Sequence, residues 1–228
     1  MPALVIIAVI AFVVGAFVIS QKLAAQRAAE LQSVAAQAGL EFSATDTTQY
    51  DAMGFDLFRK GDERSWKNVM WQASNPQGAR VFEYQYTTHS TDSKGNRTSS
   101  TTHHTVTMFD VPANCAHLTI GPENLATRLA DHIGMRDIEF ESEEFNRMFN
   151  IKCPDRQFAS AFCDSQMMQW LMTNADKTRF ELNNGFGIAY TSKMAPPALP
   201  AVLNFGQQFR AAIPTVVSSL FPRLDTQI

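Results

Sequence analysis

The sequence predicts an α+β fold in which one N-terminal transmembrane helix continues into a stalk and then a mixed domain. Three observations support this. The run from Pro2 to Ser20 is apolar and uncharged, alternating Thr-rich and aromatic-rich runs lie within 79–110, and helical periodicity appears in later segments. The strand-strand-helix order, with a later strand-helix-strand section, favours α+β over a doubly wound sheet. The expected parts are an anchor at 1–21, a helical stalk at 22–39 and a cytoplasmic domain at 40–228.

The composition of the 228-residue chain excludes several classes of protein. It is 45% hydrophobic and 18% charged, and its net charge is −3. These values rule out a disordered tail, a collagen-like or disulfide-dense scaffold and a polybasic nucleic-acid binder, so no nucleic-acid partner is expected. A second uncharged run of similar length is absent from the sequence, which excludes a multi-span membrane protein.

The apolar run is expected to remain as a membrane anchor, because at about 1.5 Å per residue it is long enough to cross the hydrocarbon core. A signal peptide, the alternative, needs a basic segment before its apolar stretch, and none precedes Pro2. The first cations are Lys22 and Arg27, and positive flanks stay on the cytoplasmic side. This predicts a single-pass protein of the cell membrane with its N-terminus outside and its domain in the cytoplasm.

Ala11 and Gly15 form a small-xxx-small pair within the anchor. Such a pair permits close approach of a second membrane helix. Ala and Gly are also common in spans that face only lipid, which is the alternative. The expected partners are therefore the lipid bilayer and an integral membrane protein complex.

The stalk, residues 21–39, is rich in Ala, Gln and Leu, and Gly39 suits a C-cap, so the membrane helix is predicted to continue to this point. Apolar and long side chains recur there at spacings of three and four, at Leu23, Arg27, Leu31 and Val34. One face of the stalk is expected to pack on the domain.

The clearest strand signal is a hairpin within 79–110. Its two alternating runs flank TDSKGNR, where Gly95 and Asn96 tolerate the positive φ of a turn. The predicted register has an odd-length loop centred near Gly95.

This register rests on which side chains face one another, because a slip of one residue turns every side chain to the opposite face. It pairs Phe82 with Met108, Tyr84 with Val106 and Tyr86 with His104. A slip of one residue would instead set Phe82 and Tyr84 against threonines, which make a poorer core face.

Strand, cap and turn signals predict the remaining elements. The expected strands are 66–73, 117–120, 137–140, 148–152, 179–182 and 187–192, with a turn at Asn183-Asn184-Gly185 between the last two. The expected helices are 121–134 with Pro122 at its first position, two short helices capped by Ser142 and Asp155, and one capped by Asp164 or Ser165. An amphipathic helix over 201–221, with a kink at Pro214, ends the chain.

This last helix is expected to pack against its own domain. A partner groove and a membrane surface are the alternatives, but an interfacial helix usually carries several cations on its polar face. Here only Arg210 lies before Pro222.

Histidines and acidic residues offer little chemistry at the sequence level. His103 and His104 are adjacent in a strand, so they point to opposite faces and cannot easily bind one ion, and His89 could add to only one of them. His117 and His132 lack metal-type spacing. Glu139 and Glu141 could share a strand face, whereas Glu143 and Glu144 suit the first turn of a helix. No metal site and no catalytic residue are predicted.

Other motifs of chemistry are missing from the sequence. It contains no GxSxG nucleophile turn and no phosphate loop, and Gly185 and Gly187 are followed by a strand rather than a helix. Cys115, Cys153 and Cys163 cannot all pair within one chain and are expected to be reduced structural thiols, a reactive Cys153 beside Lys152 being the alternative. No cofactor is predicted.

The segment FESEEFNRMFNIKCPDRQFASAFCDSQMMQWLM, residues 140–172, resembles a domain of unknown function found in membrane-anchored bacterial, chiefly actinobacterial, proteins. The similarity includes NVMWQ, VFEYQYTTHSTDSKGNRT and GPENLATRLADHIGMRDIEFES, and so covers about residues 53–192. The resemblance implies an anchored cytoplasmic module and transfers no catalytic residues.

Three functions remain open from the sequence. The first is a non-catalytic interaction module, an accessory subunit or scaffold of a larger membrane assembly, with an energy-converting complex as one host. The second is a small-molecule sensor, with a pocket lined by Tyr84, Tyr86 and Trp170. The third is an unrecognised hydrolase, which perturbed carboxylate or histidine pKa values within a pocket would indicate. The interaction module is the preferred hypothesis, and the protein is not expected to be an enzyme.

Overall fold

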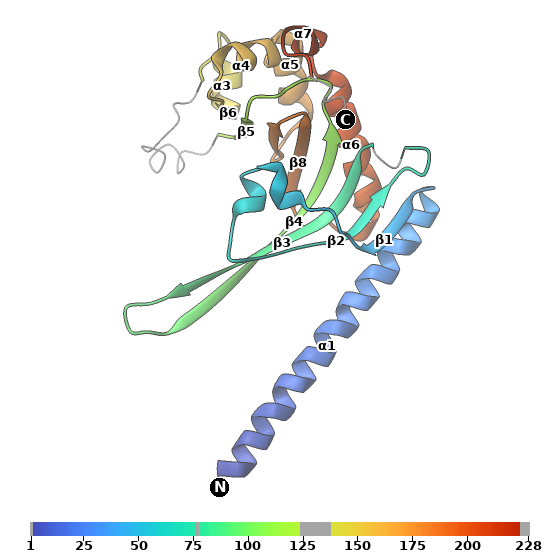
Figure 1. The fold of residues 1–228 in the computed structure, drawn as a ribbon, viewed down its shortest axis with the longest axis vertical. Coiled ribbons are helices and arrows are strands. Elements are labelled where there is room, and N and C mark those ends of the chain that lie inside the picture. The colour runs from blue at the N-terminus through green and yellow to red at the C-terminus, as the bar shows by residue number, and fades with distance from the viewer. Residues whose placement is uncertain (1, 76–77, 124–137, 224–228) are drawn as a thin grey trace.

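The computed structural model describes residues 2–75, 78–123 and 138–223. It confirms the α+β class: a long N-terminal helix leads into a domain built on one eight-stranded antiparallel sheet with several helices (Figure 1). The order of strands across the sheet is β1-β2-β3-β4-β8-β7-β5-β6.

The strands alternate with helices mainly in the second half of the chain. The strands are β1 (Glu41–Thr45), β2 (Glu63–Trp71), β3 (Arg80–Thr91), β4 (Arg97–Asp110), β5 (Leu118–Pro122), β6 (Phe149–Lys152), β7 (Arg179–Asn183) and β8 (Phe186–Ser192). The α-helices are α1 (Pro2–Gln37), α3 (Glu143–Met148), α4 (Arg156–Phe162), α5 (Ser165–Asn174), α6 (Leu199–Ala212) and α7 (Thr215–Leu220). Three 3-10 helices complete the elements: η1 (Tyr50–Met53), η2 (Leu57–Arg59) and η3 (Pro196–Ala198).

Helix α1 runs through both the predicted anchor and the predicted stalk without a break. It ends before Gly39, whose φ of 68° lies in the left-handed region that glycine adopts without strain. Leu31 and Ala35 are buried against the domain, whereas Leu23 is 60% exposed. The stalk therefore packs on the domain through its last turns.

The β3–β4 hairpin forms, but its register differs from the prediction by two residues. Phe82 pairs with Val106 and Tyr84 with His104. The turn causes the shift, because the Asp92 carboxylate accepts hydrogen bonds from the backbone N–H groups of Lys94 and Asn96 at 2.8 and 2.9 Å. A shift of two residues keeps every side chain on the predicted face.

Two other predictions are corrected. Pro122 ends β5, where it pairs with Phe149, instead of starting a helix. Most of the predicted helix 121–134 lies outside the described residues. The expected strand over 137–140 is absent from described residues 138–140, because the side chain of Asn146 bonds both backbone groups of Phe140.

The expected C-terminal helix is broken into α6 and α7 at Pro214. Proline disfavours the helical conformation of the residue before it, and Ile213 has an extended ψ of 126°. Leu199, Leu203 and Phe209 are buried, so α6 packs against its own domain as expected.

Most of the other local predictions are confirmed. Ser142 caps α3, Asp155 caps α4 and Asp164 caps α5, each through a side-chain oxygen that accepts a backbone N–H. The β7–β8 hairpin turns at Asn184 and Gly185, both with positive φ, as a type I′ turn requires.

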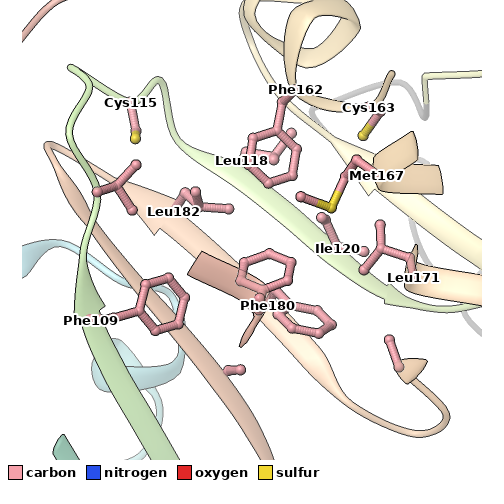
Figure 2. Close-up of a cluster of buried hydrophobic side chains, with 14 of the residues drawn as sticks. Phe109, Cys115, Leu118, Ile120, Phe162, Cys163, Met167, Leu171, Phe180 and Leu182 are labelled. Atoms are coloured by element: carbon pink, nitrogen blue, oxygen red, sulfur yellow. The ribbon is translucent and has the colours of Figure 1, made fainter. Parts of the chain in front are cut away.

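The sheet separates two hydrophobic layers because neighbouring residues of a strand point to opposite faces. On one face, helices cover a core that includes Phe109, Leu118 and Phe180 (Figure 2). On the other face, the segment that contains η1 and η2 covers an aromatic cluster around Phe58 and Tyr84. Alternation in β7 shows the division: Phe180 and Leu182 face the helices, and Glu181 faces the other layer.

Candidate functional site

The junction between α1 and the sheet is held by a buried carboxylate. Glu83, on β3, is 4% exposed in its side chain and accepts hydrogen bonds from Arg27 Nε at 3.0 Å and Arg27 Nη2 at 2.6 Å. Arg27 Nη2 also donates to the backbone oxygen of Met194 at 2.7 Å. One arginine of the long helix is thereby bonded both to the sheet and to the segment after β8.

A β-bulge in β2 completes this junction. The pairing of β2 with β3 shifts between Lys67 and Met70, and Asn68 adopts a positive φ of 57° at that point. The bulge aims the Asn68 amide at Glu83 Oε2, 2.6 Å away. Sequence reasoning missed this contact because Asn68 lies inside an otherwise regular strand pattern.

The electrostatics of Glu83 favour its ionised form. Burial by itself would raise the pKa of this carboxyl, but hydrogen bonds from Arg27 and Asn68, with the charges of Lys193 and Arg27, hold the pKa below its ordinary value. Lys193 Nζ lies 3.7 Å from Glu83 Oε1. The junction is thus a charged and hydrogen-bonded joint between the helix and the domain.

The other end of α1 projects away from the domain with its apolar side chains exposed (Figure 1). Phe12 is 78% exposed and Phe17 is 62% exposed. The helical segment Ile10–Gln37 is long and apolar enough to cross a membrane, and no other helix among the described residues is. Such exposure of large apolar side chains indicates a surface that is covered by lipid or by another protein.

The residues predicted for helix packing lie within this exposed stretch. Ala11 and Gly15 are both exposed, and a Cβ added to Gly15 would meet no atom within 4 Å. The structure therefore leaves this small-residue face open. Whether a second helix packs there stays a prediction.

A second buried carboxylate, Glu181, lies on the opposite face of the sheet. Its oxygens accept hydrogen bonds from the backbone N–H of Asp56 at 2.6 Å and of Leu57 at 3.1 Å, and from the Tyr190 hydroxyl at 3.2 Å. Glu181 is 2% exposed. It therefore ties the start of η2 to β7 and β8.

His117 lies beside this carboxylate. Its Nε2 is 3.7 Å from Asp56 Oδ2 and 4.0 Å from Glu181 Oε2. Interaction with Glu181 raises the pKa of His117 above its usual range, against the lowering effect of burial. Ligand atoms of the three side chains lie within 4.8 Å of one another, a grouping that sequence spacing could not show because the residues come from three distant segments.

A cavity of about 280 Å³ opens next to Glu181. Its lining contains cations as well as acids: Asp56, Glu181, Lys60, Lys152 and Arg179. Arginine and lysine charges at the same cavity oppose the binding of a metal cation, so we interpret the cluster as a balanced set of charges. The expectation of no metal site stays a prediction.

The structure does not bring the predicted pocket residues together. Tyr84 is 1% exposed in the aromatic layer, where its hydroxyl donates to the Leu57 oxygen at 3.1 Å, and Tyr86 packs against the same layer. Trp170 lies on the opposite face of the sheet, against Phe205 and Phe209. The predicted pocket was wrong because the alternation of side chains across the sheet was not combined with the strand order.

A groove of about 370 Å³ lies instead between the sheet and the start of α6. Its lining is mostly apolar and includes Met194, Ala198, Val202 and Phe205. Thr107 Oγ1, also in the lining, is buried without a hydrogen-bond partner. A mostly apolar lining with a few polar groups is typical of a small-molecule site.

The remaining titratable candidates behave as structural groups. His103 and His104 point to opposite faces of β4, as predicted. His104 stacks on Tyr84. Burial lowers the pKa of His103, and the positive charges of Lys193 and Lys67 lower it further. His132 lies outside the described residues. Glu143 and Glu144 occupy the first turn of α3, and Glu139 and Glu141 are exposed.

All three cysteines are free and buried, as expected for structural thiols. Burial raises the pKa of Cys115 to about 11 and also raises the pKa of Cys153 and Cys163. High pKa values make these thiols poor nucleophiles at neutral pH. A reactive Cys153, the alternative, is therefore not favoured.

Comparisons with known proteins give one structural neighbour. No protein-family model matches the chain, and no curated protein matches it. The fold is similar to the crystal structure of the mycobacterial trehalose monomycolate transport factor A, with a TM-score of 0.54 and 11% sequence identity. The match covers 87% of this chain and 98% of the other. At this identity the likeness shows a shared fold.

Proposed function

We propose that this protein is a non-catalytic, membrane-anchored interaction module, a single-span accessory subunit or scaffold of a larger membrane assembly. The observation that carries the proposal is the continuity of α1. The helix passes from exposed apolar turns to Arg27 and the buried Leu31 without a flexible linker. A rigid joint keeps the domain close to the bilayer in a fixed orientation, which suits docking on a membrane partner.

The membrane helix adds a second contact to this proposal. The open face at Ala11 and Gly15 allows a helix of the partner to approach closely. Helices gain little hydrophobic driving force from associating in lipid, so the domain supplies much of the affinity, through an interface of about 1,200 to 2,000 Å². The anchor raises the effective concentration of the domain near its partner.

The host and the orientation belong to the same proposal. The positive flank at Lys22 and Arg27 supports a cytoplasmic position of the domain. The fold shared with a transport factor is consistent with a membrane-associated accessory role. An assembly that moves molecules across the membrane is therefore a candidate host beside an energy-converting complex.

Affinity capture of the full-length protein from native membranes, after crosslinking and mild detergent extraction, tests the proposal. We expect a constant membrane-protein companion, weakened recovery with Gly15→Leu, and unchanged recovery with Ala16→Leu on a neighbouring face. Deleting residues 1–21 should weaken recovery without abolishing it. A protein that migrates alone and crosslinks to no constant companion would overturn the proposal.

Orientation is tested with an introduced thiol, because the native cysteines are buried. Ser219→Cys on α7 is exposed and far from the anchor (Figure 1). A membrane-impermeant maleimide should label this variant in lysates and leave it unlabelled in intact cells. Efficient labelling of intact cells would place the domain outside.

A small-molecule sensor is the second candidate, favoured by the groove beside α6. Ala201→Trp would fill this groove from an exposed position on the helix. Loss of the biological role with the partner still captured would support the sensor. Retention of both would leave the interaction module as the better account.

A further inference from the structure

The β3–β4 hairpin extends well beyond the rest of the sheet. Strand β2 pairs with β3 as far as Thr87, and β8 pairs with β4 only from His104 onward. Beyond these points β3 and β4 pair only with each other, up to Thr91 opposite Arg97. Residues 88–100 therefore form a two-stranded arm, which Figure 1 shows projecting from the domain.

The arm contains no apolar side chain from Thr88 to Ser100. Hydroxyl pairs across its strands support it, Thr87 with Thr101 at 2.9 Å and Ser90 with Thr98 at 2.7 Å. The Asp62 carboxylate accepts the backbone N–H of His89 at 2.8 Å. An isolated hairpin of this kind has no core and is marginal in water, so a polar surface that binds it would add to its order.

The junction with α1 places the base of this arm close to the end of the predicted membrane span. Arg27 is bonded to Glu83 and lies five positions after Lys22, at the end of the apolar run, which is about 7.5 Å along a helix. From Glu83 to Thr91 the strand extends about 26 Å at 3.3 Å per residue, which is longer than the distance to Lys22. The arm tip therefore meets the headgroups only when α1 and the arm are tilted relative to the bilayer normal. Figure 1 shows that the arm and the N-terminal half of α1 leave the domain toward the same side.

The arm has a small excess of positive charge, because it carries two cations, Lys94 and Arg97, and one acid, Asp92. At its base the acids Asp62 and Glu63 lie beside His89 and balance part of the positive charge there. Lys94 and Arg97 lie at the tip, where the turn already uses the Asp92 carboxylate for its own hydrogen bonds. Lys67 and Lys193 lie at the base, near the Arg27–Glu83 pair. A hydroxyl-rich, cationic arm is too polar for the hydrocarbon core but matches anionic headgroups, which accept hydrogen bonds and carry negative charge.

We propose that the β3–β4 arm binds anionic lipid headgroups beside α1. With the anchor it forms a two-point contact that sets the tilt of the domain over the bilayer. The inference rests on the membrane anchoring in the proposed function and adds a surface and a ligand class to it. Each cation close to an anionic surface favours the contact roughly fivefold.

The test uses the full-length protein in vesicles of phosphatidylglycerol and phosphatidylcholine. A fluorophore on Ser93→Cys reports contact of the arm tip with headgroup-spin-labelled lipids, and the buried native cysteines stay unlabelled. We expect strong quenching at position 93 and little at Ser219→Cys. The same label on Ala16→Cys, with acyl-chain quenchers, reports insertion of the anchor.

Charge variants sharpen the result. In the Ser93→Cys background, Lys94→Gln with Arg97→Gln should reduce quenching, whereas Arg156→Gln with Lys177→Gln, away from the arm, should not.

Quenching at position 16 without quenching at position 93 would overturn the arm contact alone, whereas no quenching at position 16 would refute the anchor. Equal quenching in pure phosphatidylcholine would overturn the role of anionic lipid. A photocrosslinker at position 93 that captures only protein in native membranes would also overturn it.

Discussion

Two buried glutamates on opposite faces of one sheet hold different parts of this protein together. Glu83 is bonded to side chains, the guanidinium of Arg27 and the amide of Asn68, with the ammonium of Lys193 nearby. Glu181 is bonded mainly to backbone, the N–H groups of Asp56 and Leu57. The first carboxylate attaches the anchor helix to the sheet, and the second closes the aromatic layer.

This difference has an energetic consequence. Side-chain donors can turn toward water when their acceptor is lost, whereas buried backbone N–H groups cannot. Loss of Glu181 should therefore lower the stability of the whole domain. Loss of the Glu83 contacts should mainly loosen the joint through which the domain meets the membrane.

The largest effect is expected for Glu181→Ala. It leaves the backbone N–H groups of Asp56 and Leu57 without acceptors, which should lower the free energy of unfolding by roughly 3 kcal/mol. Denaturant titration of the full chain in detergent measures this. Glu181→Gln, which keeps an acceptor oxygen, should cost less, and the exposed Glu141→Gln should cost nothing measurable. Equal stability of Glu181→Ala and wild type would contradict the proposed role.

Arg27→Met should have a smaller effect on global unfolding, roughly 2 kcal/mol, because charge-assisted hydrogen bonds to Glu83 are lost while Asn68 and Lys193 remain. Its clearest result should be faster hydrogen exchange in residues 28–37 of α1. Arg156→Met on α4 serves as the control. Unchanged exchange in α1 would show that Leu31 and Ala35 suffice to hold the joint.

His117 gives the Glu181 side a pH dependence. Because the folded-state pKa of His117 is raised, its contribution to stability is complete below its ordinary pKa of 6.5 and is lost as pH rises through the folded value. Wild type should lose stability relative to His117→Gln between about pH 6, below the ordinary pKa, and a pH above the raised folded-state pKa. Urea titrations at both pH values measure the difference. A difference that is independent of pH would refute the coupling.

The smallest effect on global stability is expected for Asp92→Ala, at a carboxylate that lies outside both layers. Its bonds to Lys94 and Asn96 organise only the tip of the arm. The denaturation midpoint should be unchanged, while amide exchange at Thr98 and Ser90 should accelerate. A shift of the midpoint as large as that of Arg27→Met would show that the arm is coupled to the core.

Local patterns accounted for much of the fold. The caps at Ser142, Asp155 and Asp164 and the turn at Asn184 were predictable because each depends on contacts within a few residues. The hairpin faces were also correct, although the Asp92 turn set a register two residues from the predicted one.

The candidate site was much less predictable. Tyr84 and Trp170 were expected to line one pocket, but the structure places them in separate layers. The strand order across the sheet, which decides this, cannot be read from aromatic composition. The pairing of Arg27 with Glu83 joins residues 56 positions apart, and that of Asp56 with Glu181 joins residues 125 apart. A glutamate in a strand of alternating polar and apolar residues is expected to face solvent unless the buried donors that bind it are known.

The sequence by itself determined where the chain becomes apolar enough for a membrane, that α1 ends just before Gly39, and which residues cap the short helices. Each of these follows from composition or from contacts within one turn, and such contacts do not depend on distant segments of the chain. Only the tertiary structure decided that Glu83 accepts hydrogen bonds from Arg27, that Glu181 accepts them from the backbone at the start of η2, and that the arm extends beside the anchor. Burying a carboxylate is unfavourable until its donors are in place, so these contacts exist only when the sheet has assembled.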